Sequence, residues 1–340
     1  MKKYLSILLS VLMIFCLVGC ASSNEEESDS SDASAEEETV KVALIASSSG
    51  LGDKSFNDAA WEGFQQAETE LGVEIKVVEP KDVADYVSSA STLAEAGYQM
   101  IFATGSDWGD TLTEVAELYP EVHFVGLNVS AEGDNVTIAR TADHQIAFLA
   151  GALAAMMSKS GTVGYLGGKE NASQVRFQVA YEEGAKYINS DINVLSTFVG
   201  AFNDPTTGKE YALEENKQGA DVIFHTAGQS GQGLFQAIQE IEDLYAIGVD
   251  SNQDYIVPGK ILTTAEKHLQ VIAYDMIKQT KEGTITSGTT VYNLANDGVG
   301  LSEMEYTKDI IGEENINKLN DIKEKIISGD IEVTDTFEQQ

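Results

Sequence analysis

Residues 50–63 carry the densest set of side chains able to bind a small polar molecule. An acid, an aromatic ring and an amide occur almost side by side at Asp53, Phe56 and Asn57. The apolar run 40–46 before them predicts a strand, and the helical spacing of apolar residues after them predicts a helix. A loop that joins a strand to a helix lies at the carboxyl end of a sheet, where open α/β folds bind ligands. We therefore expect this loop to form half of a ligand cleft.

Other loops that follow predicted strands carry matching side chains. They contribute Asp107, Trp108, Phe202, Gly228, Asp250 and Lys267. Aromatic faces in several loops can sandwich a flat ring, and such stacking is worth about 1–3 kcal/mol per base. Asp53, Asn57 and Asp107 can hydrogen-bond the edge of that ring. The carboxylate of Asp250 can accept two hydrogen bonds from a vicinal diol, as on ribose, while Lys267 can donate to the same sugar and neutralise Asp250.

Catalytic signatures are absent from the sequence. It contains no HExxH, no GxSxG and no GxxxxGK[ST] motif, and its four histidines are not at metal-ligand spacing. The pair Gly50 and Gly52 begins like a dinucleotide turn, but Ser55 occupies the position of the third glycine. Lys54, close to Asp53, argues against a calcium cage. We therefore expect a binding protein that is not an enzyme and holds no cofactor or metal.

Short apolar runs alternate with segments of helical period along most of the chain. A first series covers residues 40–126 and a second covers residues 143–249, and each predicted strand ends in a loop rich in Gly, Asn, Asp or Ser. This order predicts two α/β lobes, each with a parallel doubly wound sheet. Shorter elements up to residue 327 indicate that the chain crosses again between the lobes.

The amino terminus has the pattern of an exported protein. Two lysines precede an apolar stretch of secretory length, which ends in Leu17-Val18-Gly19-Cys20 and resembles the lipobox of bacterial lipoproteins. We expect a signal peptide over residues 1–19, a lipid anchor on Cys20 and an acidic disordered tether over residues 20–39. This places the protein on the extracytoplasmic face of the cell membrane; the alternative is an ordinary signal peptide. The only other cysteine, Cys16, lies in the discarded peptide, so no disulfide is expected.

The strongly negative net charge excludes one class of binding partner, the nucleic acids. The formal net charge is −34, and Arg140 and Arg176 are the only arginines. Such a surface cannot neutralise a phosphate backbone, so nucleic-acid binding is excluded.

Several short motifs, in order, resemble the basic membrane protein family, which comprises lipoprotein receptors of the purine nucleoside type. They are Asp53–Asn57, Gln145–Gly151, Phe202–Pro205, His225–Gly228 and Ile247–Ser251. The resemblance implies a type I periplasmic-binding-protein fold, a two-lobed clamp with three hinge crossings, acting as a monomer that delivers nucleosides to an ABC permease. It implies an N-terminal lobe of residues 40–142 plus 264–293 and a C-terminal lobe of residues 143–263 plus 294–335.

Carried over by position, the family's roles fall on the residues already singled out. Phe56 and Phe202 would stack on the base, Asp250 and Lys267 would hold the ribose, and Gly228 would offer its backbone. At residues 47–52 and 106–108 the sequence differs from the usual family sequence. These segments would contact the base, so the two differences bear on which base is preferred. A receptor for a sugar or an autoinducer remains an alternative, as does a signalling or adhesin ectodomain that uses the clamp as a scaffold.

Overall fold

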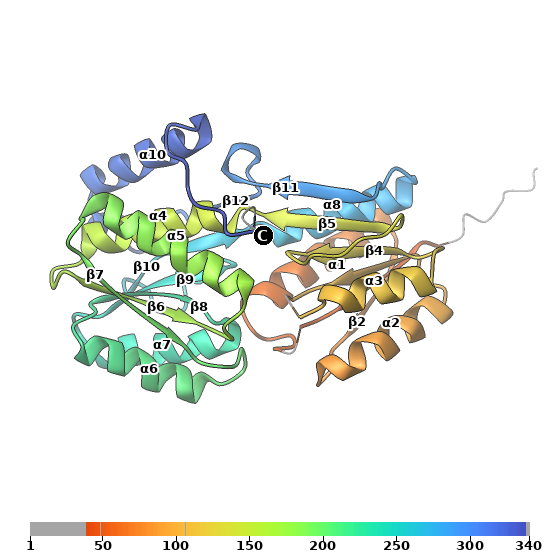
Figure 1. Cartoon of the computed structure of the whole chain (residues 1–340), viewed down its shortest axis with the longest axis horizontal. Helices are drawn as coiled ribbons and strands as arrows, with labels where there is room; N and C mark the ends of the chain where they lie inside the picture. The colour runs from red at the N-terminus through yellow and green to blue at the C-terminus, as the bar shows by residue number, and fades with distance from the viewer. Residues whose placement is uncertain (1–38, 48, 106, 338–340) are drawn as a thin grey trace, which may run out of the picture. The chain divides into compact units, whose positions relative to one another are not determined.

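The computed structural model describes residues 39–47, 49–105 and 107–337, which fold into two α/β lobes lying side by side (Figure 1). The expected signal peptide, the lipidation site Cys20 and the tether up to residue 38 lie outside the described residues. Within the described part of the chain, no helix combines the length and apolar character needed to cross a membrane.

The first lobe is built on a six-stranded sheet in which every neighbouring pair of strands is parallel. In spatial order its strands are β11 (Gly288–Tyr292), β5 (Val136–Thr141), β4 (His123–Leu127), β3 (Met100–Ala103), β1 (Lys41–Ile45) and β2 (Glu74–Val78). Helices α1 (Phe56–Leu71) and α8 (Leu269–Glu282) cover one face, and α2 (Tyr86–Glu95), preceded by the 3₁₀ turn η1 (Val83–Asp85), and α3 (Gly109–Leu118) cover the other.

The second lobe repeats this plan with a second six-stranded sheet. In spatial order its strands are β12 (Val299–Leu301), β10 (Ile261–Lys267), β9 (Tyr245–Asp250), β8 (Val222–Thr226), β6 (Thr162–Gly167) and β7 (Asn193–Phe198). Only the pair β10–β12 is antiparallel. One face carries α4 (Asp143–Met157), α5 (Ala172–Ile188) and α10 (Glu313–Ser328), and the other carries α6 (Pro205–Lys217) and α7 (Gln232–Glu240). The short pieces are η2 (Gly228–Gly231), η3 (Leu294–Asn296) and α9 (Lys308–Ile311).

The closest helix pair, α4 with α5, shows how the sequence specifies this packing. From Ile146 onward helix α4 is apolar all round, and residues 146–154 are buried, as expected of a helix covered on several sides. A Cβ atom on Gly151 would lie 2.0 Å from the backbone oxygen of Tyr181, and one on Gly184 would lie 1.9 Å from that of Phe148. The two glycines therefore allow the backbones of α4 and α5 to come into contact. This close packing determines where the first turn of α5 lies.

The chain crosses between the lobes three times, after β5, after β10 and after β11. This confirms the predicted pair of doubly wound sheets with three crossings. Two expectations need correction. Strand β5 was not predicted from the sequence, and residue 264 does not begin the return to the first lobe. Strand β10 pairs with β9 and β12 as far as Glu266 and Lys267, so the chain leaves the second sheet only after Lys267.

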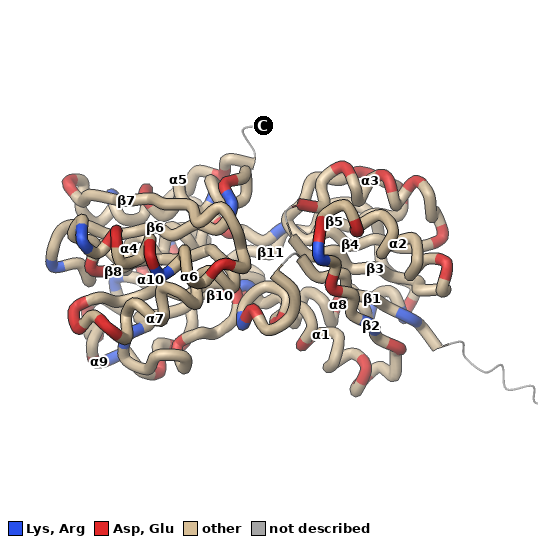
Figure 2. The backbone as a smooth tube through the Cα atoms, turned by 90° about the horizontal axis from the view of Figure 1, so that it is seen from below, with Lys and Arg blue, Asp and Glu red and all other residues tan. Residues whose placement is uncertain are grey.

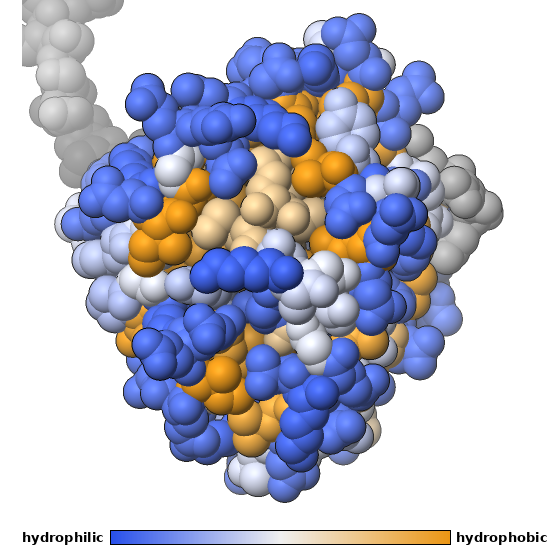
Figure 3. Space-filling model, turned by 90° about the vertical axis from the view of Figure 1, so that its left-hand side faces the viewer, coloured by the Kyte–Doolittle hydropathy of each residue, from blue (hydrophilic) through white to orange (hydrophobic). Residues whose placement is uncertain are grey.

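Acidic side chains dominate both lobes. Asp and Glu are spread along the helices and loops of each lobe, with fewer Lys and Arg between them (Figure 2). The face shown in Figure 3 is mostly hydrophilic, and its hydrophobic residues gather in separate patches. The excess of negative charge is therefore carried by both lobes, and it repels polyanions.

Candidate functional site

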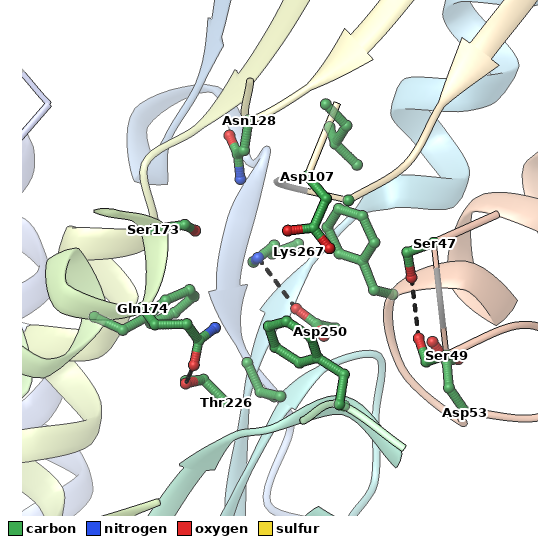
Figure 4. Close-up of a pocket in the computed structure, with 17 residues that line it drawn as sticks. Ser47, Ser49, Asp53, Asp107, Asn128, Ser173, Gln174, Thr226, Asp250 and Lys267 are labelled. Atoms are coloured by element: carbon green, nitrogen blue, oxygen red, sulfur yellow. Dashed lines mark hydrogen bonds and ion pairs between the residues drawn. The ribbon is translucent and has the colours of Figure 1, made fainter. Parts of the chain in front are cut away.

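A cavity lies between the two lobes, at the carboxyl ends of strands from both sheets. Such a position, where loops from two α/β sheets meet, is usual for small-molecule sites. Seven of the nine residues expected to bind ligand line it: Asp53, Phe56, Asp107, Phe202, Gly228, Asp250 and Lys267. Asn57 and Trp108 do not. Figure 4 shows the polar side chains of both lobes around this space.

Asp53 both lines the cavity and organises the loop that opens α1. Its carboxylate accepts the backbone N–H groups of Ser55 at 2.9 Å, Asn57 at 3.0 Å and Asp58 at 3.2 Å. Burial raises the pKa of Asp53 to about 6, although these backbone hydrogen bonds act in the opposite direction. The carboxylate is thus largely engaged in closing the first turn of the helix.

Asn57 has a positioning role in place of the expected direct contact with a ring edge. It is fully buried, and its Oδ1 accepts the backbone N–H of Ser47 at 3.0 Å and the hydroxyl of Thr104 at 2.8 Å. Its Nδ2 lies 3.0 Å from the carbonyl of Gly50 and 2.9 Å from the hydroxyl of Ser49. Because its polar atoms are engaged, Asn57 ties the ends of β1 and β3 to the loop.

Trp108 likewise lies in the core of the first lobe and not in the cavity. Its ring is fully buried and stacks on Tyr86, with 4.5 Å between the ring centroids and 10° between the planes. The aromatic residue after β3 therefore packs inward, which corrects the expectation that it faces ligand. Its neighbour Asp107 points into the cavity (Figure 4) and lies 4.0 Å from Lys169 of the second lobe.

A buried lysine lies at the hinge, where β10 ends. The Nζ of Lys267 is 3.2 Å from Asp250 and 3.5 Å from Asp143, and the lysine is 5% exposed. Burial acts to lower the pKa of Lys267, but the two carboxylates outweigh it and the pKa is raised. The ammonium is therefore charged at neutral pH and holds Asp250 at the cavity wall.

Aromatic rings from both lobes border the cavity. Phe56, from the first lobe, and Phe177, from α5 of the second, lie with their ring centroids 5.0 Å and 4.9 Å from the Nζ of Lys267. Phe202 packs against backbone, since a Cβ on Gly168 would lie 2.3 Å from its ring. The cavity can thus offer apolar faces from two directions beside a charged polar group.

The two lobes are in direct hydrogen-bonded contact beside the cavity. Ser251 donates to the carbonyl of Lys54 at 3.0 Å, and Gln253 donates to the same carbonyl at 2.9 Å. The hydroxyl of Ser55 donates to the carboxylate of Asp250. These contacts join the β1–α1 loop to the loop after β9, so the structure shows a closed clamp.

Some lining residues escaped the sequence analysis. They are Ser47, Ser49, Leu127, Asn128, Ser173, Gln174, Phe177, Thr226 and Val249, together with Gly105. Ser173, Gln174 and Phe177 lie in the first two turns of α5, whose start is marked by the capping residue Asn171 after Gly167-Gly168. A cap after a glycine-ended strand was the sequence signal that could have identified this wall of the cavity.

His225 is fully buried and does not line the cavity. Burial lowers the pKa of His225 to about 4, so its ring is neutral, and its Nε2 lies 3.1 Å from Gln253 Oε1. Among the residues that the structure describes, no three His, Cys, Asp or Glu side chains are grouped to hold a metal ion.

Comparison with known proteins agrees with this geometry. The model of the Bmp family, described as "ABC transporter substrate-binding protein PnrA-like", matches residues 39–336. The chain belongs to the Bmp family. A family relative from Lactococcus lactis subsp. cremoris, "ABC transporter nucleoside-binding protein BmpA", is 30% identical over 325 residues, covering 89% of this chain and 91% of the relative. "Basic membrane protein D" of Borreliella burgdorferi is 30% identical over 332 residues, covering 95% and 93%.

Solved structures show the same fold. A solute-binding protein of an ABC transporter system from Aeropyrum pernix K1 superposes with a TM-score of 0.82 at 27% identity, covering 87% of this chain and 93% of that one. The expected α/β clamp of the periplasmic solute-binding proteins is therefore confirmed, and the Bmp family assignment makes this chain an ABC transporter substrate-binding protein.

Proposed function

We propose that this substrate-binding protein captures nucleosides, with purine nucleosides favoured, and presents them to an ABC permease while anchored to the membrane through Cys20. The main support for the proposal is that one cavity combines aromatic side chains with a buried ion pair. Aromatic side chains from both lobes border it, and the buried pair Asp250–Lys267 stands at its hinge side. A nucleoside has a flat apolar base next to a sugar diol, so it can satisfy both at once.

In this proposal each group has one task. Phe56 and Phe202 provide faces for the base, and Asp107 offers an acceptor at its edge. Asp250 accepts hydrogen bonds from the ribose hydroxyls, and Lys267 donates to the same sugar. A free sugar has no flat aromatic ring to stack between aromatic faces from both lobes, which favours a nucleoside over a sugar. The relative from Lactococcus lactis, whose name includes nucleoside binding, gives independent support.

Closure of the clamp would be the signal that a permease reads. The contacts that join Lys54 to Ser251 and Gln253 form only when the lobes meet. A ligand that bridges Phe56 and Asp250 would add its own contacts to these, and would therefore favour the closed form over the open one.

Isothermal titration calorimetry with inosine, guanosine, adenosine, cytidine and uridine tests the ligand class. We expect heat with nucleosides, most strongly with the purine members, and none with ribose, galactose or arabinose. Binding of free sugars without nucleosides would overturn the nucleoside proposal and favour the sugar receptor. Product analysis of the same mixtures should return intact nucleosides, because the proposal assigns no hydrolysis.

The anchor and the oligomeric state are tested separately. Metabolic labelling with a palmitate analogue should mark the wild-type protein and not Cys20→Ser, which should be released from the membrane fraction. Equal labelling of both proteins would contradict the anchor. Light scattering of the chain without its lipid should give the mass of a monomer.

A further inference from the structure

The side-chain amide of Gln174 is held rigidly at the wall of the cavity. Its Oε1 accepts the backbone N–H of Gly168 at 2.9 Å and the hydroxyl of Thr226 at 2.7 Å. Because a backbone N–H can only donate, this contact identifies which amide atom is oxygen. The Nε2 atom must then be on the other side, and Figure 4 shows it turned toward the space that holds Lys267 and Asp250.

The amide nitrogen of Gln174 has no hydrogen-bond acceptor among the residues that the structure describes, although the side chain is only 6% exposed. This donor faces the cavity, so a ligand atom that accepts from it replaces its contact with water, whereas a ligand that covers it without accepting leaves it unpaired at a cost in free energy. The opposite wall supplies acceptors instead, through Asp107 and Asp250.

We propose that Gln174 is a specificity-determining residue that selects ligands with a hydrogen-bond acceptor, such as a ring nitrogen or carbonyl of the base, facing the start of α5. This inference rests on the proposed function, because it names the feature of the nucleoside that the same cavity reads. A ligand that presents a donor or a C–H group there leaves Nε2 unpaired and binds more weakly.

The test uses calorimetry with inosine, with its 3- and 7-deaza analogues, each of which replaces one ring-nitrogen acceptor by C–H, and with purine riboside, which lacks the carbonyl of the base. We expect one analogue to bind the wild type roughly 2- to 12-fold more weakly than inosine, the range supplied by one neutral hydrogen bond. Gln174→Met should bind inosine more weakly by a similar factor and no longer distinguish that analogue from inosine. Gln174→Glu, which keeps the acceptor for Gly168, should weaken inosine binding further.

Gln178→Glu is the matched control, one turn further along α5 and outside the cavity, and it should leave affinity unchanged. If inosine binds the wild type and Gln174→Met still discriminates among all analogues as the wild type does, the inference is wrong. If no nucleoside binds the wild type, the proposed function fails instead, so the two failures are distinguishable.

A separate observation concerns the carboxyl terminus, where both arginines of the chain meet one ring. The ring centroid of Phe337 lies 4.7 Å from the guanidinium carbon of Arg176, on α5 of the second lobe, and 5.7 Å from that of Arg140, on β5 of the first. The segment after α10 returns toward the junction of the two lobes (Figure 1). Residues 335–337 thus touch both lobes beside the first hinge crossing.

Arg176 connects this segment to the hinge. Its Nε and one terminal nitrogen bind the carboxylate of Asp335 at 2.7 and 2.6 Å, and its other terminal nitrogen donates to the carbonyl of Thr141 at 2.8 Å. The same nitrogen lies 3.9 Å from Asp143, which is 3.5 Å from Lys267. Charges of alternating sign therefore run from Asp335 to Lys267, which holds Asp250 in the ligand cavity.

We infer that residues 335–337 form a strap that restrains the hinge and sets ligand affinity through this chain of charges. Without the carboxylate of Asp335, Arg176 draws Asp143 toward itself, and Lys267 is then free to draw Asp250 away from the ligand. The strap therefore acts as a positioning element for Asp250.

Asp335→Asn tests the strap, with Glu332→Gln as a matched control that removes the same charge from an exposed site in the same segment. Small-angle X-ray scattering of the ligand-free protein should show a larger radius of gyration for Asp335→Asn only. Inosine affinity should fall about 5-fold or more, the lower end of usual coupling between sites. If Asp335→Asn folds poorly, Phe337→Leu, which keeps Asp335, provides the test instead. It should raise the radius of gyration and weaken inosine binding in the same direction, but less. A lower melting temperature with unchanged scattering and affinity would show that the strap only stabilises the fold.

Discussion

Replacing Asp250 with Asn isolates the proposed sugar contact while leaving the fold intact. The side chain keeps its size, and its amide oxygen can still accept from Ser55. Lys267 keeps Asp143 as a partner at 3.5 Å, so no buried charge is left alone. What changes is the number and charge of the acceptors at the cavity wall, because an amide offers one oxygen where the carboxylate offers two.

The size of the effect follows from the contacts of Asp250. One carboxylate oxygen lies 3.2 Å from Lys267 and the other accepts from Ser55, so a sugar hydroxyl must share oxygens that are already polarised. A hydrogen bond to a charged acceptor contributes about 1.5–3 kcal/mol. Losing one such bond raises Kd roughly 12- to 140-fold, at about 1.4 kcal/mol for each factor of ten.

Calorimetry with inosine and 2′,3′-dideoxyinosine assigns this loss to the sugar. Asp250→Asn should weaken inosine binding by that factor and should change dideoxyinosine binding little, because the hydroxyls that meet Asp250 are missing from the analogue. Asp243→Asn, at an exposed position of the same lobe, should match the wild type for both ligands. Equal losses for inosine and dideoxyinosine would refute the ribose assignment.

Three further predictions concern packing and pH. Trp108→Phe should leave inosine affinity within about twofold of wild type and lower stability by about 1–3 kcal/mol, because the ring stacks on Tyr86 outside the cavity; a large loss of affinity would return Trp108 to the site. Burial raises the pKa of Glu215 to about 8 from its ordinary 4.5, so the folded protein keeps a proton that the unfolded chain releases. The free energy of unfolding should therefore fall as pH rises from 4.5 to 8, by on the order of 5 kcal/mol at most. Urea unfolding should show a shallower pH dependence for Glu215→Gln, and identical slopes would contradict this. Gly184→Ala should lower the free energy of unfolding by about 1–3 kcal/mol or more, because the added Cβ would clash with the backbone of α4. Glu182→Ala, on the same helix, should have little effect, and the midpoints of urea unfolding compare the two variants.

Sequence patterns predicted the fold well where strands are continuous apolar runs. Strands β1, β3, β6 and β8 are buried along nearly their whole length, so their sequences are recognisable without tertiary context. Strand β5 alternates apolar residues with Thr and Arg140, and it escaped prediction although all but Arg140 are buried. The hydroxyl of Thr141, at the end of the strand, donates to Asp143 at the start of α4, and its backbone carbonyl accepts from Arg176 of α5. Only the folded second lobe supplies these partners.

The candidate site was predictable as a set of loops but not in the direction of each side chain. Trp108 and Phe56 both occur near the carboxyl ends of strands, yet one packs into the core and the other borders the cavity. Asn57 was expected to contact the ligand, but its side-chain amide is engaged in hydrogen bonds with the backbone of the loop, at Ser47 and Gly50. Gln174 was missed because a polar residue in a helix has no periodic signal, and its importance depends on Gly168 holding its oxygen.

The most direct test of the account exposes ligand-free, refolded protein to an equimolar mixture of nucleosides, free bases and sugars. After filtration to remove unbound compounds, the protein is denatured and the released small molecules are identified by mass spectrometry. We expect nucleosides, and purine nucleosides above all, to be retained in proportion to the protein. Retention of sugars or bases in preference to nucleosides, or of none of these compounds, would contradict it.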